Sequence, residues 1–376
     1  MNYDLNEEQQ ILKNSAHNFF VKECPSTFVR AMIDDPKGYS PEMWKKMAEL
    51  GWLGLMFPEQ YGGSEGTFAD LTVLLFEMGY VCLPSPFFST VVLGGLTLLG
   101  WGNEKQKTQL LTEIANGERI VTLAWTEKSG TFEANGISLK AELKDDQFTL
   151  TGTKLFVPNA HIADTMIVAA RTKNSQGEDG ISLLLVDGKS PGIKTEVLKT
   201  FSGDKQCEVN FDKVRVPKEN LLGELDQGFA ILKEVLRKAA VAKCAEMSGG
   251  GQKVIELVIP HVKERKQFGH PVGSFQAVQH HCANILTYVD TTRFITYQAA
   301  WKIAEGLPYE KDASMCKTWV SDSYRRLVGL GHQVMGGMGF MEEHDLQLYF
   351  KQAKTAELAL GDGDFHRELV AQQMGL

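Results

Sequence analysis

The sequence predicts an α+β protein in which a helical segment, a β segment and a second helical segment follow one another along 376 residues. Apolar side chains recur at helical spacing from about residue 5 to 120, and again after Gly228. Between these segments, short apolar runs alternate with turn residues. We therefore expect three domains: an N-terminal helical domain at 1–120, a β domain at 121–227, and a C-terminal helical bundle at 228–376.

The N-terminal segment opens with a helix signal. Asn6 and Gln9 have the spacing of a capping box, in which each side chain bonds the backbone N–H of the other residue. One helical face then contains Leu12, Ala16, Phe19 and Phe20. Two further helices are expected at residues 44–50 and 69–80, and the turn sequence Leu-Pro-Ser-Pro ends the second of them.

The later segments differ in period. Four strand candidates lie at 148–150, 166–170, 181–186 and 209–216, separated by Asp, Gly, Asn and Pro turns at roughly ten-residue spacing. This spacing predicts a small antiparallel module. Long helices are then expected at 229–266, 276–306 and 311–331.

Charge and composition narrow the class of protein. The formal net charge of −8 argues against a nucleic-acid surface, because phosphate binding needs clustered Lys and Arg. The sequence contains no run of about 18 apolar residues, so no membrane span is predicted. The acidic N-terminus lacks the features of a secretion signal. The six cysteines form no CxxC pair, which predicts no metal site and a cytoplasmic protein.

Four stretches carry a resemblance to a known family. They are MAELGWLGLMFPEQYGGSEG at 47–66, VNFDKVRVPKENLLGELDQGF at 209–229, ERKQFGHPVGSFQAVQ at 264–279 and HQVMGGMGF at 332–340. In this order and spacing they resemble the acyl-CoA dehydrogenases along nearly the whole chain. The resemblance implies an acyl-CoA dehydrogenase-like fold whose C-terminal four-helix bundle also mediates oligomerisation.

The resemblance implies FAD as the cofactor. A guanidinium such as that of Arg265 suits bidentate contact with phosphate, and glycines let bare backbone approach the adenosine. The GGxG sequence at 336–339 alone favours an ordinary turn, and the Arg265 motif shifts the interpretation to a cofactor loop. In the family these residues reach the flavin of the neighbouring subunit, which implies a dimer or larger assembly. The corresponding residues are Arg265, Gln267, Phe268, Gln276, Gln333, Gly336, Gly337 and Gly339.

The side of the site that faces the flavin ring resembles the family less closely. Thr126 corresponds to a threonine that contacts the flavin, and Phe156 stands where the family usually has Trp. As a core aromatic residue in a strand, Phe156 has an equally good structural explanation. Pro158 replaces a common threonine donor, and proline has neither a hydroxyl nor a backbone N–H.

The glutamate base of the family is missing. Proton removal beside the thioester carbonyl needs a carboxylate with a raised pKa. Between the fixed points Ala353-Lys354 and Arg367, the corresponding position is Leu360, which cannot take a proton. An alternative base position in the family falls at Ala239 and is also empty. Arg237 and Ala240 replace an Asp and an Arg that normally help to hold CoA.

Three explanations for the missing base stay open. Asp362 or Asp364 serves as a displaced base, although capping of a helix N-terminus explains both residues more simply. Alternatively, the chain is one subunit of a hetero-oligomer whose partner owns the base, as in some acyl-CoA dehydrogenases that act on steroid or other bulky esters. The third explanation is different chemistry on a ring substrate, and the predicted acyl-pocket segment at 84–95 offers no acid for it.

The predicted activity is therefore flavin-dependent α,β-dehydrogenation of an acyl-CoA with a bulky or cyclic acyl group. Electrons would pass to an electron-transferring flavoprotein. The competing hypothesis is a non-catalytic subunit that completes the FAD site of a paralogous partner. A flavin oxidase or monooxygenase is a weaker third hypothesis, because fold alone does not fix function.

Overall fold

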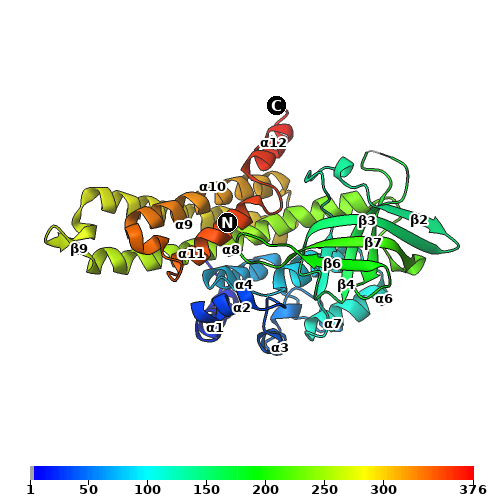
Figure 1. Ribbon diagram of the computed structural model, residues 1–376, viewed down its shortest axis with the longest axis horizontal. Coiled ribbons are helices and arrows are strands. Elements are labelled where there is room, and N and C mark those ends of the chain that lie inside the picture. The colour runs from blue at the N-terminus through cyan, green and yellow to red at the C-terminus, as the bar shows by residue number, and fades with distance from the viewer. Residues whose placement is uncertain (1–3, 176) are drawn as a thin grey trace. The chain divides into compact units, whose positions relative to one another are not determined.

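The computed structural model describes residues 4–175 and 177–376, which form two compact units (Figure 1). The helical unit contains the N-terminal stretch up to Ala31, Thr67–Leu83 and Arg237–Leu376. The sheet unit contains Met32–Gly66 and Pro84–Leu236. The predicted α+β class, with N-terminal helices, a central sheet and C-terminal helices, is confirmed. The domain boundaries after residues 120 and 227 stay a prediction.

The first helix begins at the cap that the sequence indicates. Asn6 caps α1 (Glu7–Glu23) with the reciprocal Gln9 contacts of a capping box, as predicted, and Ala16 and Phe20 are fully buried. Thr67 and Asp70 cap α4 in the same way. The other N-terminal helices are α2 (Ser26–Asp34), α3 (Pro41–Glu49), α4 (Phe68–Tyr80), α5 (Leu96–Trp101), α6 (Glu104–Gln106) and α7 (Thr112–Ala115).

The long C-terminal helices α8 (Gly228–Glu264), α9 (Gln276–Ala304) and α10 (Glu310–Met335) are close to their predicted ranges. Two shorter helices that were not predicted separately follow them, α11 (Leu346–Leu358) and α12 (Gly363–Gln373). Glycines let α8 approach its neighbours: a Cβ on Gly249 would lie 1.8 Å from the Phe76 carbonyl oxygen of α4, and one on Gly250 would lie 2.2 Å from the Tyr324 hydroxyl of α10. A short hairpin of β9 (Lys266–Gln267) and β10 (His270–Pro271) joins α8 to α9 (Figure 1).

The central sheet has the order β6-β7-β3-β2-β4-β5-β8, with β1 added beside β4. The four predicted strands correspond to β3, β4, β5 and β7. The sheet comprises β1 (Val121–Ala124), β2 (Lys140–Lys144), β3 (Gln147–Pro158), β4 (Thr165–Arg171), β5 (Ile181–Asp187), β6 (Ile193–Val197), β7 (Gln206–Pro217) and β8 (Leu221–Leu222).

The expectation of a purely antiparallel module was wrong. Strand β1 pairs in parallel with β4, from Val121 opposite Thr165 to Ala124 opposite Val168. All four residues of β1 are buried, so the strand shows no polar–apolar alternation, and β2 and β3 intervene in the chain between β1 and β4. In the part of the chain that the structure describes, no helix is long and apolar enough to cross a membrane.

The predicted acyl-pocket segment adopts an unusual conformation. Most of it forms a π-helix, η3 (Phe88–Gly95), a conformation that is rare and concentrated at functional sites. The Thr90 hydroxyl ties it to β1 by donating to the Val121 carbonyl oxygen at 3.1 Å and accepting from the Val121 N–H at 3.2 Å.

Candidate flavin and acyl-CoA site

The predicted phosphate-binding residues lie on the surface of the helical unit, around the β9–β10 hairpin. Arg265, Gln267, Phe268 and Gln276 are all exposed, and the Phe268 side chain reaches 90% exposure with a left-handed φ of 54°. A bulky residue at positive φ is rare and is kept only where the surroundings or a function require it. These side chains therefore point away from the chain's own core, as residues that bind a group outside it would.

The glycine loop provides open backbone. Helix α10 ends at Met335, and Gly336 then takes φ 59° and ψ −141°, a conformation that favours glycine. A Cβ added to Gly336 or Gly337 would meet nothing within 4 Å, and Gln333 is exposed. Gly339 differs, because it is buried and its added Cβ would lie 3.0 Å from the Met335 Cβ. Gly339 therefore serves packing, while Gly336 and Gly337 leave room for a ligand.

The hairpin and the glycine loop offer different groups to a dinucleotide. A guanidinium and side-chain amides fit the diphosphate of FAD, and unobstructed backbone fits its adenosine part.

The candidates for the flavin-ring side belong to the sheet unit. The Thr126 carbonyl oxygen accepts a hydrogen bond from the Leu155 N–H at 2.9 Å, which joins the two candidate segments. Phe156 has φ 53° at a bulge in β3 opposite β7 and is 57% exposed, so it does not fill a core. The Pro158 carbonyl oxygen accepts from the Thr122 hydroxyl at 2.6 Å.

A buried ion pair lies between these two segments. The Lys154 Nζ is 2.7 Å from the Glu127 Oε1, with side-chain exposures of 0% and 7%. Burial lowers the pKa of Lys154 to about 8. Burial also acts to raise the pKa of Glu127, but the charge and hydrogen bonds of Lys154, with bonds from Ser138 and Leu139, outweigh it and lower that pKa.

The loop at Leu360, the position predicted to lack the base, is held from two sides. Leu360 follows α11 and takes a left-handed φ of 61°, which is strained for leucine. Its carbonyl oxygen accepts from the His366 Nε2 at 2.9 Å, while the Gly361 carbonyl oxygen accepts from the Lys317 Nζ at 2.8 Å. Burial lowers the pKa of His366 to about 4, so the ring is neutral at pH 7.

Lys317 organises this loop from α10. Its buried ammonium donates to the Ser321 hydroxyl at 3.0 Å and to the Ala356 and Glu357 carbonyl oxygens at 3.1 and 3.0 Å, besides Gly361. Burial lowers the pKa of Lys317 to about 8. A cation at the C-terminal carbonyls of a helix such as α11 is favourably placed in the field of the helix dipole.

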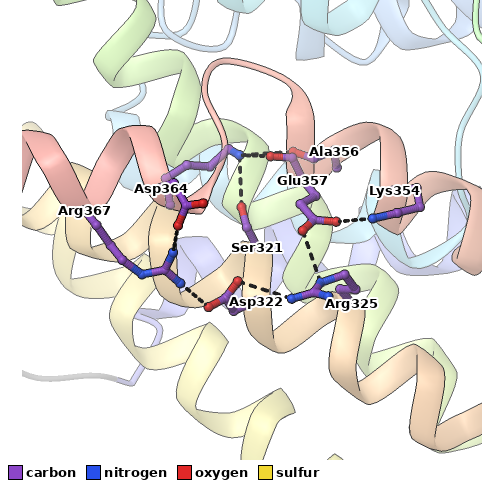
Figure 2. Close-up of polar contacts among 9 residues, drawn as sticks. Ser321, Asp322, Arg325, Lys354, Ala356, Glu357, Asp364 and Arg367 are labelled. Atoms are coloured by element: carbon purple, nitrogen blue, oxygen red, sulfur yellow. Dashed lines mark hydrogen bonds and ion pairs between the residues drawn. The ribbon is translucent and has the colours of Figure 1, made fainter.

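The two candidate aspartates have structural contacts. Asp362 is the N-cap of α12, and its carboxylate accepts from the Phe365 N–H at 2.9 Å. The Asp364 side chain is 90% exposed and pairs with Arg367, which also bonds Asp322 (Figure 2). The capping explanation therefore describes Asp362 directly. A catalytic role for either aspartate stays a prediction.

Asp364 ends a chain of alternating charges across three helices, which Figure 2 shows. Arg325 connects Asp322 with Glu357, at 3.7 Å and 3.1 Å, and Lys354 lies 3.0 Å from Glu357. This chain links α10, α11 and α12 on either side of the Leu360 loop. Networks of this kind restrain geometry better than isolated surface pairs.

The α8 positions that correspond to the alternative base and the CoA contacts contain no carboxylate. Ala239 and Ala240 are fully buried, and Arg237 is half-buried. Among the residues that the structure describes, no group of three or more His, Cys, Asp or Glu side chains is arranged to hold a metal ion.

Comparison with known proteins decides the family. Models of the acyl-CoA dehydrogenase N-terminal, middle and C-terminal domains match residues 6–118, 122–214 and 226–375. The chain belongs to the acyl-CoA dehydrogenase family. The acyl-CoA dehydrogenases are FAD-dependent oxidoreductases, so FAD, the cofactor predicted from the sequence, is the cofactor of this family.

Individual acyl-CoA dehydrogenase relatives match over full length. The chain is 32% identical to a probable acyl-CoA dehydrogenase, YngJ, from Bacillus subtilis, covering 100% of both chains. It is 29% identical to an acryloyl-CoA reductase (NADH) from Anaerotignum propionicum, covering 100% of this chain and 96% of that one. The structure of butyryl-CoA dehydrogenase from Megasphaera elsdenii has a TM-score of 0.94 at 27% identity, covering 100% of both chains.

Sequence reasoning missed both buried lysines of this chain. A signal for each was present. Lys154 continues the inward-facing alternation of Phe148 and Leu150 in β3, where an apolar residue is expected. Lys317 lies four residues after the buried Ala313 and three before the buried Val320, on the apolar face of α10. A charged residue in the apolar phase of an element indicates a buried partner.

Proposed function

We propose that this chain takes part in the flavin-dependent α,β-dehydrogenation of an acyl-CoA with a bulky or cyclic acyl group, and that electrons leave through an electron-transferring flavoprotein. The exposed set of Arg265, Gln267, Gln276 and the open glycine backbone at 336–337 carries the proposal. These groups suit a dinucleotide bound outside their own chain, which implies that a second subunit shares the site.

The roles of the residues follow from their chemistry. FAD, when bound, supplies the hydride acceptor. Arg265 provides a delocalised cation for phosphate, and the glycine backbone approaches the adenosine without a Cβ. Phe156 offers an exposed aromatic face for the flavin, and the hydroxyl of Thr126 supplies a donor. Loss of the α proton still requires a base, and leucine at 360 cannot provide one.

A second candidate function is favoured by the contacts of the two aspartates. The Asp362 carboxylate is already bonded as a helix cap, and Asp364 is paired at the exposed surface. A general base must reach the proton that it removes, in an environment that raises its pKa. The chain would then be a non-catalytic subunit that contributes Arg265 and the glycine loop to a base-bearing paralogue.

The test begins with the protein purified alone. Its flavin spectrum is recorded, and the protein is titrated anaerobically with linear, branched and alicyclic acyl-CoAs. Bleaching of the flavin by one ester supports the dehydrogenase, and Asp362→Asn and Asp364→Asn then show whether either carboxylate is the base. Protein that takes up flavin and gains activity only with a second subunit supports the partner function. Protein that binds neither flavin nor acyl-CoA, alone or with paralogues, contradicts both.

Leu360→Glu sharpens the test. The bonds from Lys317 and His366 to the 360–361 backbone do not involve the Leu360 side chain. A glutamate there should take the same backbone path and supply the missing carboxylate. If this variant bleaches with an ester that leaves the native protein unchanged, the native chain lacks only its base.

A further inference from the structure

The Glu127–Lys154 ion pair lies within two residues of both flavin-ring candidates in the sequence. Glu127 follows Thr126, and Lys154 comes two residues before Phe156. The pair is buried, with the Lys154 Nζ 2.7 Å from the Glu127 Oε1. Neither charged group is therefore presented to a ligand, and any effect on the flavin must act through the neighbouring residues.

Lys154 and its neighbour hold the segment after β1 that carries Thr126. The Lys154 Nζ donates to the Trp125 carbonyl oxygen at 3.1 Å, and the Leu155 N–H donates to the Thr126 carbonyl oxygen at 2.9 Å. Residues 125, 126 and 127 are thus each bonded to residue 154 or 155. Phe156 lies within β3 at the bulge that follows Lys154, so its position depends on the same anchor.

Glu127 also bonds the two residues that precede β2. Its carboxylate accepts from the Ser138 and Leu139 N–H groups, each at 3.0 Å, and from the Ser138 hydroxyl. With Lys154 added, the carboxylate is well supplied with donors. A satisfied buried network of this kind rigidifies its surroundings.

Stability alone is a weak reason to keep such a pair. Well-packed apolar residues of similar volume often replace a buried ion pair without loss of stability. Hydrogen bonds from a cation to one carbonyl and one carboxylate, however, fix backbone position in a way that apolar contacts do not.

We propose that Glu127 and Lys154 are positioning residues that set Thr126 and Phe156 against the flavin ring. The inference rests on the proposed flavin-dependent function. It assigns the pair a role in cofactor geometry beyond the cohesion of the sheet, without contact between either residue and substrate or cofactor.

The test compares Lys154→Met with Arg171→Met in the complete protein, by FAD affinity, the visible spectrum of bound FAD and thermal unfolding. Arg171 is a matched control, because it is also a buried cation of the sheet and donates to the Ile137 and Ala134 carbonyl oxygens. Lys154→Met should raise the FAD dissociation constant about tenfold and shift the flavin bands, since misplaced supporting residues weaken a preorganised site. Arg171→Met should lower thermal stability with an unchanged flavin spectrum.

Further variants distinguish a positioning role of the ion pair from a role in the stability of the sheet. Lys154→Arg keeps the charge and donors and should restore the native spectrum, and Glu127→Gln replaces Lys154→Met if that variant does not fold. Native affinity and spectrum in Lys154→Met or Glu127→Gln overturn the positioning role, while native protein that still binds FAD leaves the proposed function standing. Native protein that binds no FAD, alone or with a paralogue, overturns both.

Discussion

Two buried lysines fix candidate site segments by different means. Lys154 in the sheet unit faces a carboxylate, whereas Lys317 in the helical unit donates to one hydroxyl and three carbonyl oxygens. Both are fully buried, and burial lowers the pKa of each to about 8. A buried lysine therefore holds a strand through an ion pair with a carboxylate in one case, and holds the end of a helix through hydrogen bonds to backbone carbonyl oxygens in the other. The consequences of removing each lysine should therefore differ.

The largest effect is expected from Lys154→Met. It leaves Glu127 charged, buried and without its cation, and breaking a buried pair from one side costs about 3–5 kcal/mol. The free energy of unfolding, measured by urea denaturation, should fall by about 4 kcal/mol.

The double variant Glu127→Leu/Lys154→Met is the control for this prediction. It removes both charges at similar volume, so it should recover part of the lost stability. A double variant that is less stable than Lys154→Met would show that the carboxylate stabilises residues 138–139 even without the lysine.

Acid should destabilise the helical unit by protonating the neutral His366 ring. The pKa of His366 in the folded chain is about 4, against an ordinary 6.5, so the unfolded chain binds more protons between these values. The contribution of His366 to the free energy of unfolding is therefore fully present above pH 6.5. It is lost as the pH falls toward 4, and this loss is about 3 kcal/mol at most. The charges of two neighbours act on the pKa of His366 in opposite directions: Lys317 lowers it and Asp362 raises it.

His366→Gln provides the measurement for this acid effect. Glutamine keeps an N–H donor for the Leu360 carbonyl oxygen but does not titrate. Urea denaturation of both proteins at intervals from pH 7 to pH 4 should show a smaller loss of stability in the variant. Equal slopes would place the acid-sensitive group elsewhere.

Lys317→Met should be milder than Lys154→Met. It leaves carbonyl oxygens at the end of α11 without a donor, but no buried carboxylate in contact, and unsatisfied polar groups of this kind cost about 1–3 kcal/mol. We expect a loss of about 2 kcal/mol in urea denaturation, with faster hydrogen exchange around residues 359–362. A loss equal to that of Lys154→Met would remove the distinction between the two anchors.

Much of the fold was readable from periodicity and caps. The capping box at Asn6 and the long helices after Gly228 follow from local rules, because each depends on residues close in sequence. Periodicity did not indicate strand β1, since a four-residue strand buried on both faces shows no alternating burial and its parallel partner lies about 40 residues away.

The candidate site was readable only where a motif marks it. Arg265 and the glycines at 336–337 stand in motifs, and their exposure agrees with a role outside their own chain. The anchors at Lys154 and Lys317 depend on long-range partners, Glu127 and Gly361, which sequence spacing does not reveal. The positive φ of Leu360 likewise arises from tertiary bonds to its loop.

The smallest effects separate the two aspartates beside Leu360. Asp362→Ala removes an N-cap and should lower the free energy of unfolding by about 1 kcal/mol. Asp364→Asn should leave stability unchanged, because an exposed pair with Arg367 adds little. A base would behave in the opposite way, with flavin bleaching lost and stability kept. If Asp364→Asn abolishes bleaching by an acyl-CoA that reduces the native protein, Asp364 is the displaced base. If the flavin of both variants is bleached normally, the base lies outside the 360–367 loop. The bonds from Lys317 and His366 then support the shape of this loop and have no part in proton transfer.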